Sequence, residues 1–265
     1  MHSLSPADLV ILLVEPSATQ RRIISNNLAE EAVHQVDCAT GLADALARLA
    51  ESRPDLVLSS LHFEDGSALE LVRAMGRDPE LAKVPFMLVT SEQRPAQLEA
   101  FKQSGVVALL PKPFSREQLG RALNATLDLL SPDELELSHF DVQSLRVLVV
   151  DDSRLARRHI KRVLENLGVS RITEAEDGAQ AQQLLGLHMF DLVVTDYNMP
   201  HVNGRELAEH IRSQSQQSHL PILMVTSEAN GAHLANITQA GINAICDKPF
   251  EPMVVKEMLY RLLND

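Results

Sequence analysis

The sequence predicts two tandem α/β domains, each a doubly wound parallel sheet of five strand–helix pairs. Two observations predict this fold. The chain contains an internal repeat at constant spacing, and within each copy short apolar runs alternate with stretches of helical period. A length of 265 residues suits two ordinary domains, each able to bury its own core.

Four separated blocks of the first half recur in the second half in a single register. Val10 corresponds to Arg146, which gives the spacing (146 − 10 = 136). One spacing over four blocks indicates a duplicated domain. The matched blocks are Val10–Val14 with Arg146–Val150, Asp55–Leu58 with Asp191–Val194, Thr90–Glu92 with Thr226–Glu228, and Lys112–Phe114 with Lys248–Phe250.

The strands and helices of each copy follow from local patterns. Continuous apolar runs such as Leu56–Leu58 and Leu192–Val194 indicate strands buried on both faces. Ser153 is an N-cap candidate for a helix over 155–167, and Gly168 is its C-terminal stop. The apolar stripe of this helix contains Leu155, Ile160, Val163, Leu164 and Leu167.

The boundary between the copies lies in a short acidic segment that begins with a helix-breaking proline at Pro132. We therefore expect a first domain over 1–130, a linker over 131–144 and a second domain over 145–265.

The charge balance excludes several classes of partner. There are 36 acidic and 24 basic side chains, and the formal charge is −12, which disfavours direct nucleic-acid binding and gives no polybasic membrane anchor. Apolar runs are strand-sized, and the N-terminus has no signal-peptide pattern, so we expect a cytoplasmic protein without membrane insertion. The two cysteines, Cys38 and Cys246, fall in different copies and are expected to be reduced; for Cys246 we favour a buried strand cysteine over redox control.

Chemistry-bearing residues gather at the expected strand ends of the second copy. Asp151 and Asp152 end its first strand and Asp196 its third, while Thr226 and Lys248 lie at the ends of the fourth and fifth. In a doubly wound sheet the carboxyl ends of the central strands form the ligand site, so these side chains are expected to share one pocket.

Three close carboxylates repel one another unless a cation neutralises them. Without Cys or His ligands, the oxygen set favours Mg²⁺. One carboxylate is then left to attack a phosphoryl group, whose oxygens the ion, Lys248 and Thr226 would stabilise. The alternatives are a solvated acidic patch with a salt-bridging lysine, and for Thr226 a plain strand residue.

The second copy resembles the receiver domains of response regulators, and its motifs occur in that family's order and spacing. The resemblance implies a flavodoxin-like fold and a nearest likeness to the single-domain chemotaxis regulator. The motifs are Val149–Ser153, Val194–Pro200, Met224–Ser227 and Asp247–Phe250.

The resemblance also implies roles for the site residues. Asp196 would accept phosphate from a histidine kinase or a histidine phosphotransfer protein. Asp152 and Asp196 would bind Mg²⁺ directly, Asn198 through its backbone carbonyl and Asp151 through water. Lys248 would contact the phosphoryl group, in a Lys248–Pro249 peptide that is often cis in the family, and Thr226 would swing inward on phosphorylation.

Three positions bear on switching and lifetime. The family usually has Tyr or Phe three residues before the lysine, where this chain has Ile245, which puts the usual readout through the fourth helix, fifth strand and fifth helix in doubt. Asn198 and Glu228 flank the site as in the chemotaxis regulator, which implies a short-lived phosphoryl group.

The first copy has lost most of these groups. Asp151–Asp152 is replaced by Glu15–Pro16, and Asp196 by Ser60. The loop that follows is shorter before its glycine (66 − 60 = 6 against 204 − 196 = 8). We interpret this copy as a pseudo-receiver, with an inert Ser60. Thr90 and Lys112 remain from the motif and are interpreted as relics or packing residues, and Leu109 stands at the position that is usually aromatic.

We therefore expect a phosphorylation-controlled signalling switch with an unknown downstream protein target, and no enzyme activity beyond self-catalysed phosphotransfer and dephosphorylation. The first domain would dimerise the protein or dock a partner. The alternatives are the regulatory part of a larger output protein such as a diguanylate cyclase, and an adaptor that never carries phosphate. A haloacid-type hydrolase would need an Asp where Asn198 stands.

Overall fold

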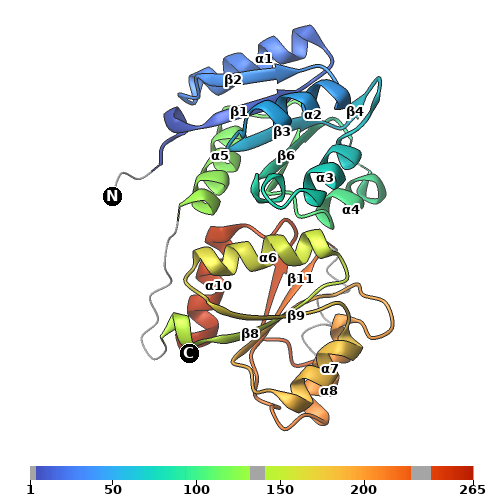
Figure 1. Cartoon of the computed structure of the whole chain (residues 1–265). Helices are drawn as coiled ribbons and strands as arrows, with labels where there is room; N and C mark the ends of the chain where they lie inside the picture. Colours follow the sequence, from blue (N-terminus) through green and yellow to red (C-terminus); the bar gives the residue numbers. More distant parts are fainter. Residues whose placement is uncertain (1–3, 93, 132–140, 228–239, 265) are drawn as a thin grey trace. The chain divides into compact units, whose positions relative to one another are not determined.

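In the computed structural model the chain divides into two compact units, Met1–Ser131 and Pro132–Asp265 (Figure 1). The structure describes residues 4–92, 94–131, 141–227 and 240–264. Within these ranges no helix combines the length and the apolar character that a membrane span requires. Glu228, most of the expected linker and the helix expected between the last two strands of the second unit lie outside the described residues.

The first unit contains a parallel five-stranded sheet in the order β2-β1-β3-β6-β7. A two-stranded hairpin, β4-β5, follows β3. Its elements are η1 (Pro6–Asp8), β1 (Val10–Val14), α1 (Ala18–Glu30), β2 (Gln35–Ala39), α2 (Leu42–Glu51), β3 (Leu56–Ser60), β4 (His62–Phe63), β5 (Gly66–Ser67), α3 (Ala68–Arg77), η2 (Leu81–Lys83), β6 (Phe86–Thr90), α4 (Pro95–Lys102), β7 (Ala108–Pro111) and α5 (Arg116–Leu130).

The second unit repeats this sheet in the order β9-β8-β10-β11-β12, again parallel throughout. Both sheets therefore have the doubly wound order 2-1-3-4-5, and the predicted fold class is confirmed. The elements are η3 (Val142–Ser144), β8 (Arg146–Val150), α6 (Arg154–Asn166), β9 (Arg171–Ala175), α7 (Gly178–Leu187), β10 (Leu192–Asp196), α8 (Gly204–Ser213), β11 (Ile222–Thr226), β12 (Ala244–Asp247) and α10 (Pro252–Asn264).

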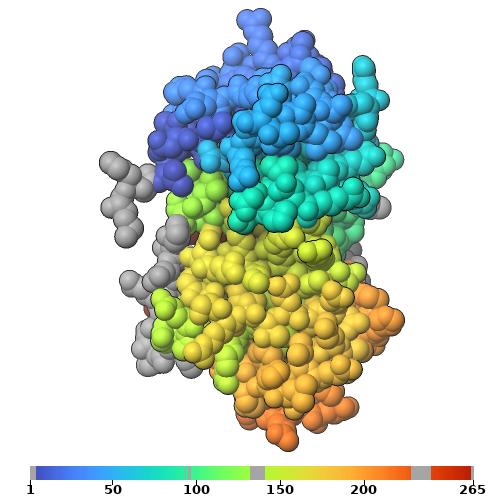
Figure 2. Space-filling view, viewed as in Figure 1, coloured from blue at the N-terminus to red at the C-terminus, as the bar shows by residue number. Residues whose placement is uncertain are grey.

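The central strands are buried because helices cover both faces of each sheet. Every residue of β3, β6, β10 and β11 is buried. In the first unit, alternate strand residues pack with α1 and α5 on one face. In the second unit, strand residues on one face pack with α7 and α8, and buried residues of α6 and α10 add to the core. Side chains fill the space between the ribbons of each unit (Figure 2).

Helix α6 begins and ends within one residue of the limits that the sequence predicts. The Ser153 hydroxyl accepts a hydrogen bond from the Ala156 N–H, and Gly168 follows the helix with a φ of 96°. The interior face is more polar than the predicted stripe. Leu155 is only partly buried, whereas Arg157 and His159 are buried beside the apolar residues of the helix.

The end of the expected linker packs on the second unit. Val142, in η3, is buried, and the Ser170 hydroxyl donates to the Gln143 carbonyl at 2.8 Å. The loops after β3 and β10 also differ. The shorter one forms the β4-β5 hairpin, and the longer one returns through the Gly204 N–H, which donates to the Tyr197 carbonyl at 3.0 Å.

Candidate functional site

Four buried polar residues meet at the carboxyl ends of the central strands of the second unit. Asp151 follows β8, Asp196 and Thr226 end β10 and β11, and Lys248 follows β12. Because these strands are neighbours in one parallel sheet, residues nearly 100 positions apart reach the same pocket. Each of the four side chains is almost fully removed from solvent. The predicted convergence of these residues is present in the structure.

The Lys248 ammonium lies between two carboxylates. Its Nζ donates to Asp151 Oδ2 at 2.9 Å and lies 3.2 Å from Asp196 Oδ2. The other oxygens of the two carboxylates are held by backbone. Asp151 Oδ1 accepts from the Ser153 N–H, and Asp196 Oδ1 accepts from the Tyr197 N–H, both at 2.8 Å. These contacts fix the orientation of both carboxylates.

Burial sets the electrostatics of this pocket. Loss of solvent raises the pKa of the Asp151 carboxyl above its ordinary value, although the charge and hydrogen bond of Lys248 oppose that rise. One lysine therefore does not fully compensate the buried negative charge. A bound cation would stabilise the ionised carboxylates further.

The acidic residues fit a hard divalent cation. Asp151, Asp152 and Asp196 each offer one carboxylate oxygen, and these oxygens lie within 4.8 Å of one another. Asp152 is exposed, so one side of the group faces solvent from which an ion can enter. An all-oxygen set with room for water is the type of site that suits Mg²⁺. Asn198, whose carbonyl is the fourth expected ligand, is exposed two residues after Asp196.

The corresponding polar residues of the first unit bind to one another. Lys112 Nζ donates to Glu15 Oε2 at 2.7 Å and to the Ser60 hydroxyl at 3.3 Å, and that hydroxyl donates to the same Glu15 oxygen. Burial raises the pKa of the Glu15 carboxyl, but hydrogen bonds from Lys112, Ser60 and the Ser17 N–H outweigh it and lower the pKa overall. Lys112 is thus more than a relic, because it is the charge partner of Glu15.

The family model of the response regulator receiver domain matches the chain twice, over residues 11–124 and 147–260. The chain belongs to this family. Both units are receiver domains, and the two matched ranges correspond to the two sheets.

Curated relatives are chemotaxis proteins, each about as long as one receiver. The chain is 39% identical over 122 residues to chemotaxis protein CheY-3 of Vibrio cholerae, which covers 46% of this chain and 94% of that protein. It is 40% identical over 120 residues to chemotaxis protein CheY of Pseudomonas aeruginosa, and the matched segment is 45% of this chain and 97% of that protein.

Solved structures that resemble the chain match either nearly all of it or about half of it. A response regulator/GGDEF domain protein of a two-component system is 25% identical, with 96% of this chain and 99% of that chain covered and a TM-score of 0.42. The receiver domain of a sensor histidine kinase from Pseudomonas aeruginosa PAO1, solved with a magnesium ion coordinated in its active-site cleft, is 28% identical, with 46% and 98% covered and a TM-score of 0.43.

Two buried polar residues near the second receiver's site are missing from the sequence-based expectation. Arg157 donates from Nη1 to the Asp151 carbonyl at 2.6 Å, and His159 Nε2 donates to the Phe250 carbonyl at 3.0 Å. Helical periodicity does not predict the burial of either residue, because a polar residue within an apolar stripe is normally expected at the edge of the stripe. A signal for Arg157 exists in the repeat, since Arg21 stands at the corresponding position of the first receiver (157 − 21 = 136).

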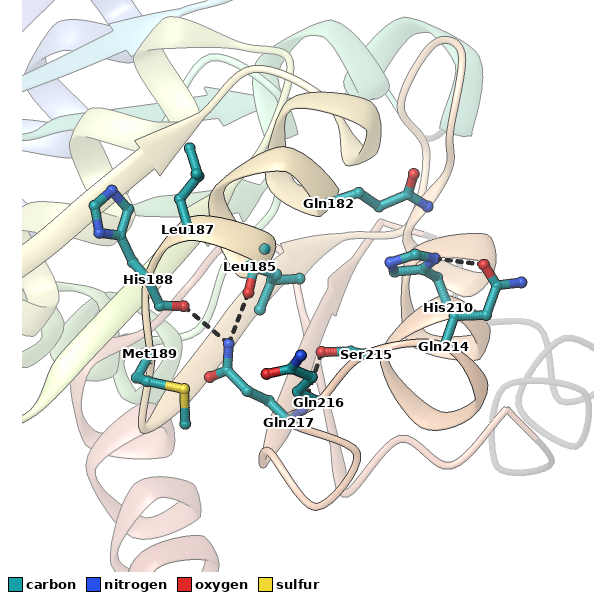
Figure 3. A pocket seen from close by; sticks show the side chains of 11 residues that line it. Gln182, Leu185, Leu187, His188, Met189, His210, Gln214, Ser215, Gln216 and Gln217 are labelled. Atoms are coloured by element: carbon teal, nitrogen blue, oxygen red, sulfur yellow. Dashed lines mark hydrogen bonds between the residues drawn. The ribbon is translucent and has the colours of Figure 1, made fainter.

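A separate hollow of about 390 Å³ lies between the C-terminal ends of α7 and α8 (Figure 3). Its buried amide, Gln217, accepts from the Phe190 N–H and donates to the carbonyls of Leu185 and His188. Phe190 precedes β10, whereas Asp196 ends it, so the hollow lies at the opposite end of the strand from the carboxylates. We assign it no part in phosphoryl chemistry. Its lining residues are Gln182, Leu185–Met189, His210 and Gln214–Gln217.

Proposed function

We propose that the second receiver accepts a phosphoryl group on Asp196 from a histidine kinase or a histidine phosphotransfer protein, and that phosphorylation changes its binding to a downstream protein. The observation that supports this most is the convergence of Asp151, Asp152, Asp196 and Lys248 at one end of the sheet. The ranges 1–130 and 145–265 are the proposed limits of the two domains.

The proposed reaction forms a bond between an Asp196 carboxylate oxygen and phosphorus, while the bond from phosphorus to the donor's imidazole nitrogen breaks. The leaving imidazole takes up a proton. Lys248, whose Nζ lies 3.2 Å from Asp196 Oδ2, would contact the incoming phosphoryl oxygens. Mg²⁺, held by Asp152 and Asp196, by Asp151 through water and by the Asn198 carbonyl, would supply positive charge for the same oxygens.

Switching is proposed to begin at Thr226, which ends β11 and is fully buried. Its carbonyl accepts from the Lys248 N–H at 2.7 Å, so the strand ends that carry the two residues are joined by their backbones. Ile245, where the family usually has an aromatic ring, is half-buried in β12. A branched aliphatic side chain has no polar group to present to solvent, so we propose a readout that does not depend on an aromatic flip.

The first receiver is proposed to keep the fold without the chemistry. Ser60 replaces the acceptor, Pro16 removes a carboxylate, and the Glu15 carboxylate is already paired with Lys112. We propose that this domain serves dimerisation or the docking of a partner.

Intact-mass measurement after incubation with Mg²⁺ and acetyl phosphate tests the proposal. We expect one phosphate-sized adduct on the wild type, none on Asp196→Asn and none with EDTA. Asp191→Asn is the matched control, because Asp191 precedes the same strand but pairs with Arg146 at its other end. The control should keep the adduct. No adduct on the wild type would favour an adaptor, and an adduct that survives Asp196→Asn would place the acceptor elsewhere.

A further inference from the structure

Arg157 is a buried cation next to the proposed metal site, although it is not one of its ligands. Its side chain is 6% exposed, and it belongs to α6, the helix that follows the Asp151–Asp152 loop. Burying a guanidinium costs several kcal/mol unless it is paired and hydrogen-bonded. The partners of Arg157 therefore indicate what its position stabilises.

One of these partners is the backbone of the metal site. Nη1 of Arg157 donates to the Asp151 carbonyl at 2.6 Å. That carbonyl belongs to the peptide plane that also contains the Asp152 nitrogen, so fixing it sets the direction in which Asp152 leaves the sheet. The Asp151 N–H donates to the Ala175 carbonyl at 3.2 Å, and its carboxylate contacts Ser153 and Lys248. The N–H, the carbonyl and the carboxylate of Asp151 thus each have a hydrogen-bond partner.

The other partners of Arg157 are two carboxylates at the end of the neighbouring strand. Nη2 donates to Glu176 Oε1 at 3.1 Å, and Nε lies 3.5 Å from Glu174 Oε2. Nε makes no hydrogen bond within the described part of the chain. These two carboxylates, of which Glu174 is 38% and Glu176 75% exposed, are the charge partners of the guanidinium, so the cation does not rely on the metal-site carboxylates for that role.

The first receiver provides an internal comparison. Arg21 donates from Nη1 to the Glu15 carbonyl at 2.6 Å and to the Pro16 carbonyl at 2.8 Å, so the backbone contact is present in both units. Cys38 and Thr40 occupy the positions of Glu174 and Glu176 (174 − 38 = 136). The carboxylate partners are therefore specific to the receiver that keeps the acidic site.

We propose that Arg157, held by Glu174 and Glu176, is a positioning residue that keeps the Asp151–Asp152 pair in the geometry that binds a divalent cation. This inference rests on the proposed function of the second receiver. Residues that orient metal ligands typically change metal affinity 10- to 100-fold when they are removed.

Calorimetric titration of the full chain with Mg²⁺ alone tests the proposal. Arg157→Met should weaken the Kd by about 10-fold, and Arg157→Lys, which keeps the charge and a donor, should recover part of that loss. Arg21→Met is the matched control, because it removes the same backbone contact in the receiver without the acidic cluster. It should leave the Mg²⁺ affinity unchanged while lowering the stability of its own unit.

The outcomes separate the two proposals. A wild type that neither binds Mg²⁺ nor forms a phosphate adduct would overturn both. A wild type that does both, with Arg157→Met binding Mg²⁺ as tightly or more tightly, would overturn the positioning role alone. If Arg157→Met does not fold, Arg157→Lys and Glu176→Gln decide the matter, because the first weakens the contact with the Asp151 carbonyl and the second removes one charge partner of the guanidinium. Weaker Mg²⁺ binding by these two variants supports the role, and unchanged binding refutes it.

Discussion

The buried imidazole of His159 should make the stability of the second receiver depend on pH. The pKa of His159 is lowered from 6.5 to about 4, mainly by burial of the ring. The hydrogen bond to the Phe250 carbonyl raises this pKa, and the charges of Arg162 and Lys248 lower it, but both effects are smaller than that of burial. Since a carbonyl only accepts hydrogen bonds, Nε2 carries the proton of the neutral ring. The Phe250 ring packs edge-on against it, with ring centroids 6.5 Å apart.

The sign and size of the effect follow from linkage. As pH falls below 6.5 the unfolded chain protonates this histidine while the folded unit does not, so stability is present above pH 6.5 and is lost between 6.5 and about 4. Between pH 7.5 and pH 5 the loss is about 2 kcal/mol from this group alone. His159→Gln keeps a side-chain donor for the Phe250 carbonyl but cannot titrate, and it is therefore the matched variant.

Urea unfolding followed by circular dichroism at the two pH values measures this effect, because the chain has no Trp. The wild type should lose about 2 kcal/mol more than His159→Gln between pH 7.5 and pH 5. An NMR titration of the ring should also give a pKa below 5. Equal losses in the two proteins, or a ring pKa near 6.5, would show that the imidazole is solvated and refute the reasoning.

Two further perturbations test the close packing at the site and the charge pair of the first receiver. An alanine at Gly204 would place Cβ 2.1 Å from the Asp196 carbonyl oxygen, so Gly204→Ala should destabilise the second receiver by about 1–3 kcal/mol and slow its phosphorylation. Gly186→Ala is the control, because a Cβ there meets nothing within 4 Å. In the same unfolding and mass assays it should be neutral or stabilising. Lys112→Met should cost the first receiver about 3 kcal/mol at pH 7 and less as the pH falls through the lowered pKa of Glu15, because protonation of that carboxylate removes the ion pair. A loss that does not change with pH would contradict the pairing.

The fold and the central site residues could be predicted because the patterns that indicate them extend over the whole chain and occur several times. A constant spacing of 136 in four blocks fixes the duplication (146 − 10 = 136), and buried apolar strands followed by helices leave few topologies besides the doubly wound sheet. Asp151, Asp196 and Lys248 then meet as a consequence of strand order. Their roles in phosphoryl transfer remain predictions.

The supporting contacts could not be predicted, because they depend on side-chain geometry that no periodic pattern encodes. Arg157 and His159 lie on the inner side of α6, where the pattern favours apolar residues. Each is accommodated by a particular backbone carbonyl, at Asp151 and at Phe250. Such acceptors lie on loops whose course follows from tertiary packing. The repeat pairs Arg157 with Arg21, but it does not say which carbonyl either side chain reaches.

The same reasoning explains why a lysine persists in a receiver that has lost its acceptor. The Lys112 ammonium, which follows β7 and is partly buried, needs an anion, and both the aspartate after β1 and the acceptor are replaced in this receiver. Glutamate at position 15 is one methylene longer than aspartate, and its carboxylate reaches both Lys112 and the Ser60 hydroxyl. The ion pair thus retains the charge balance of the pocket without an acidic cluster. For this reason we expect the folding of the first receiver to be insensitive to Mg²⁺, in contrast to the second, where Lys248 is shared between two carboxylates.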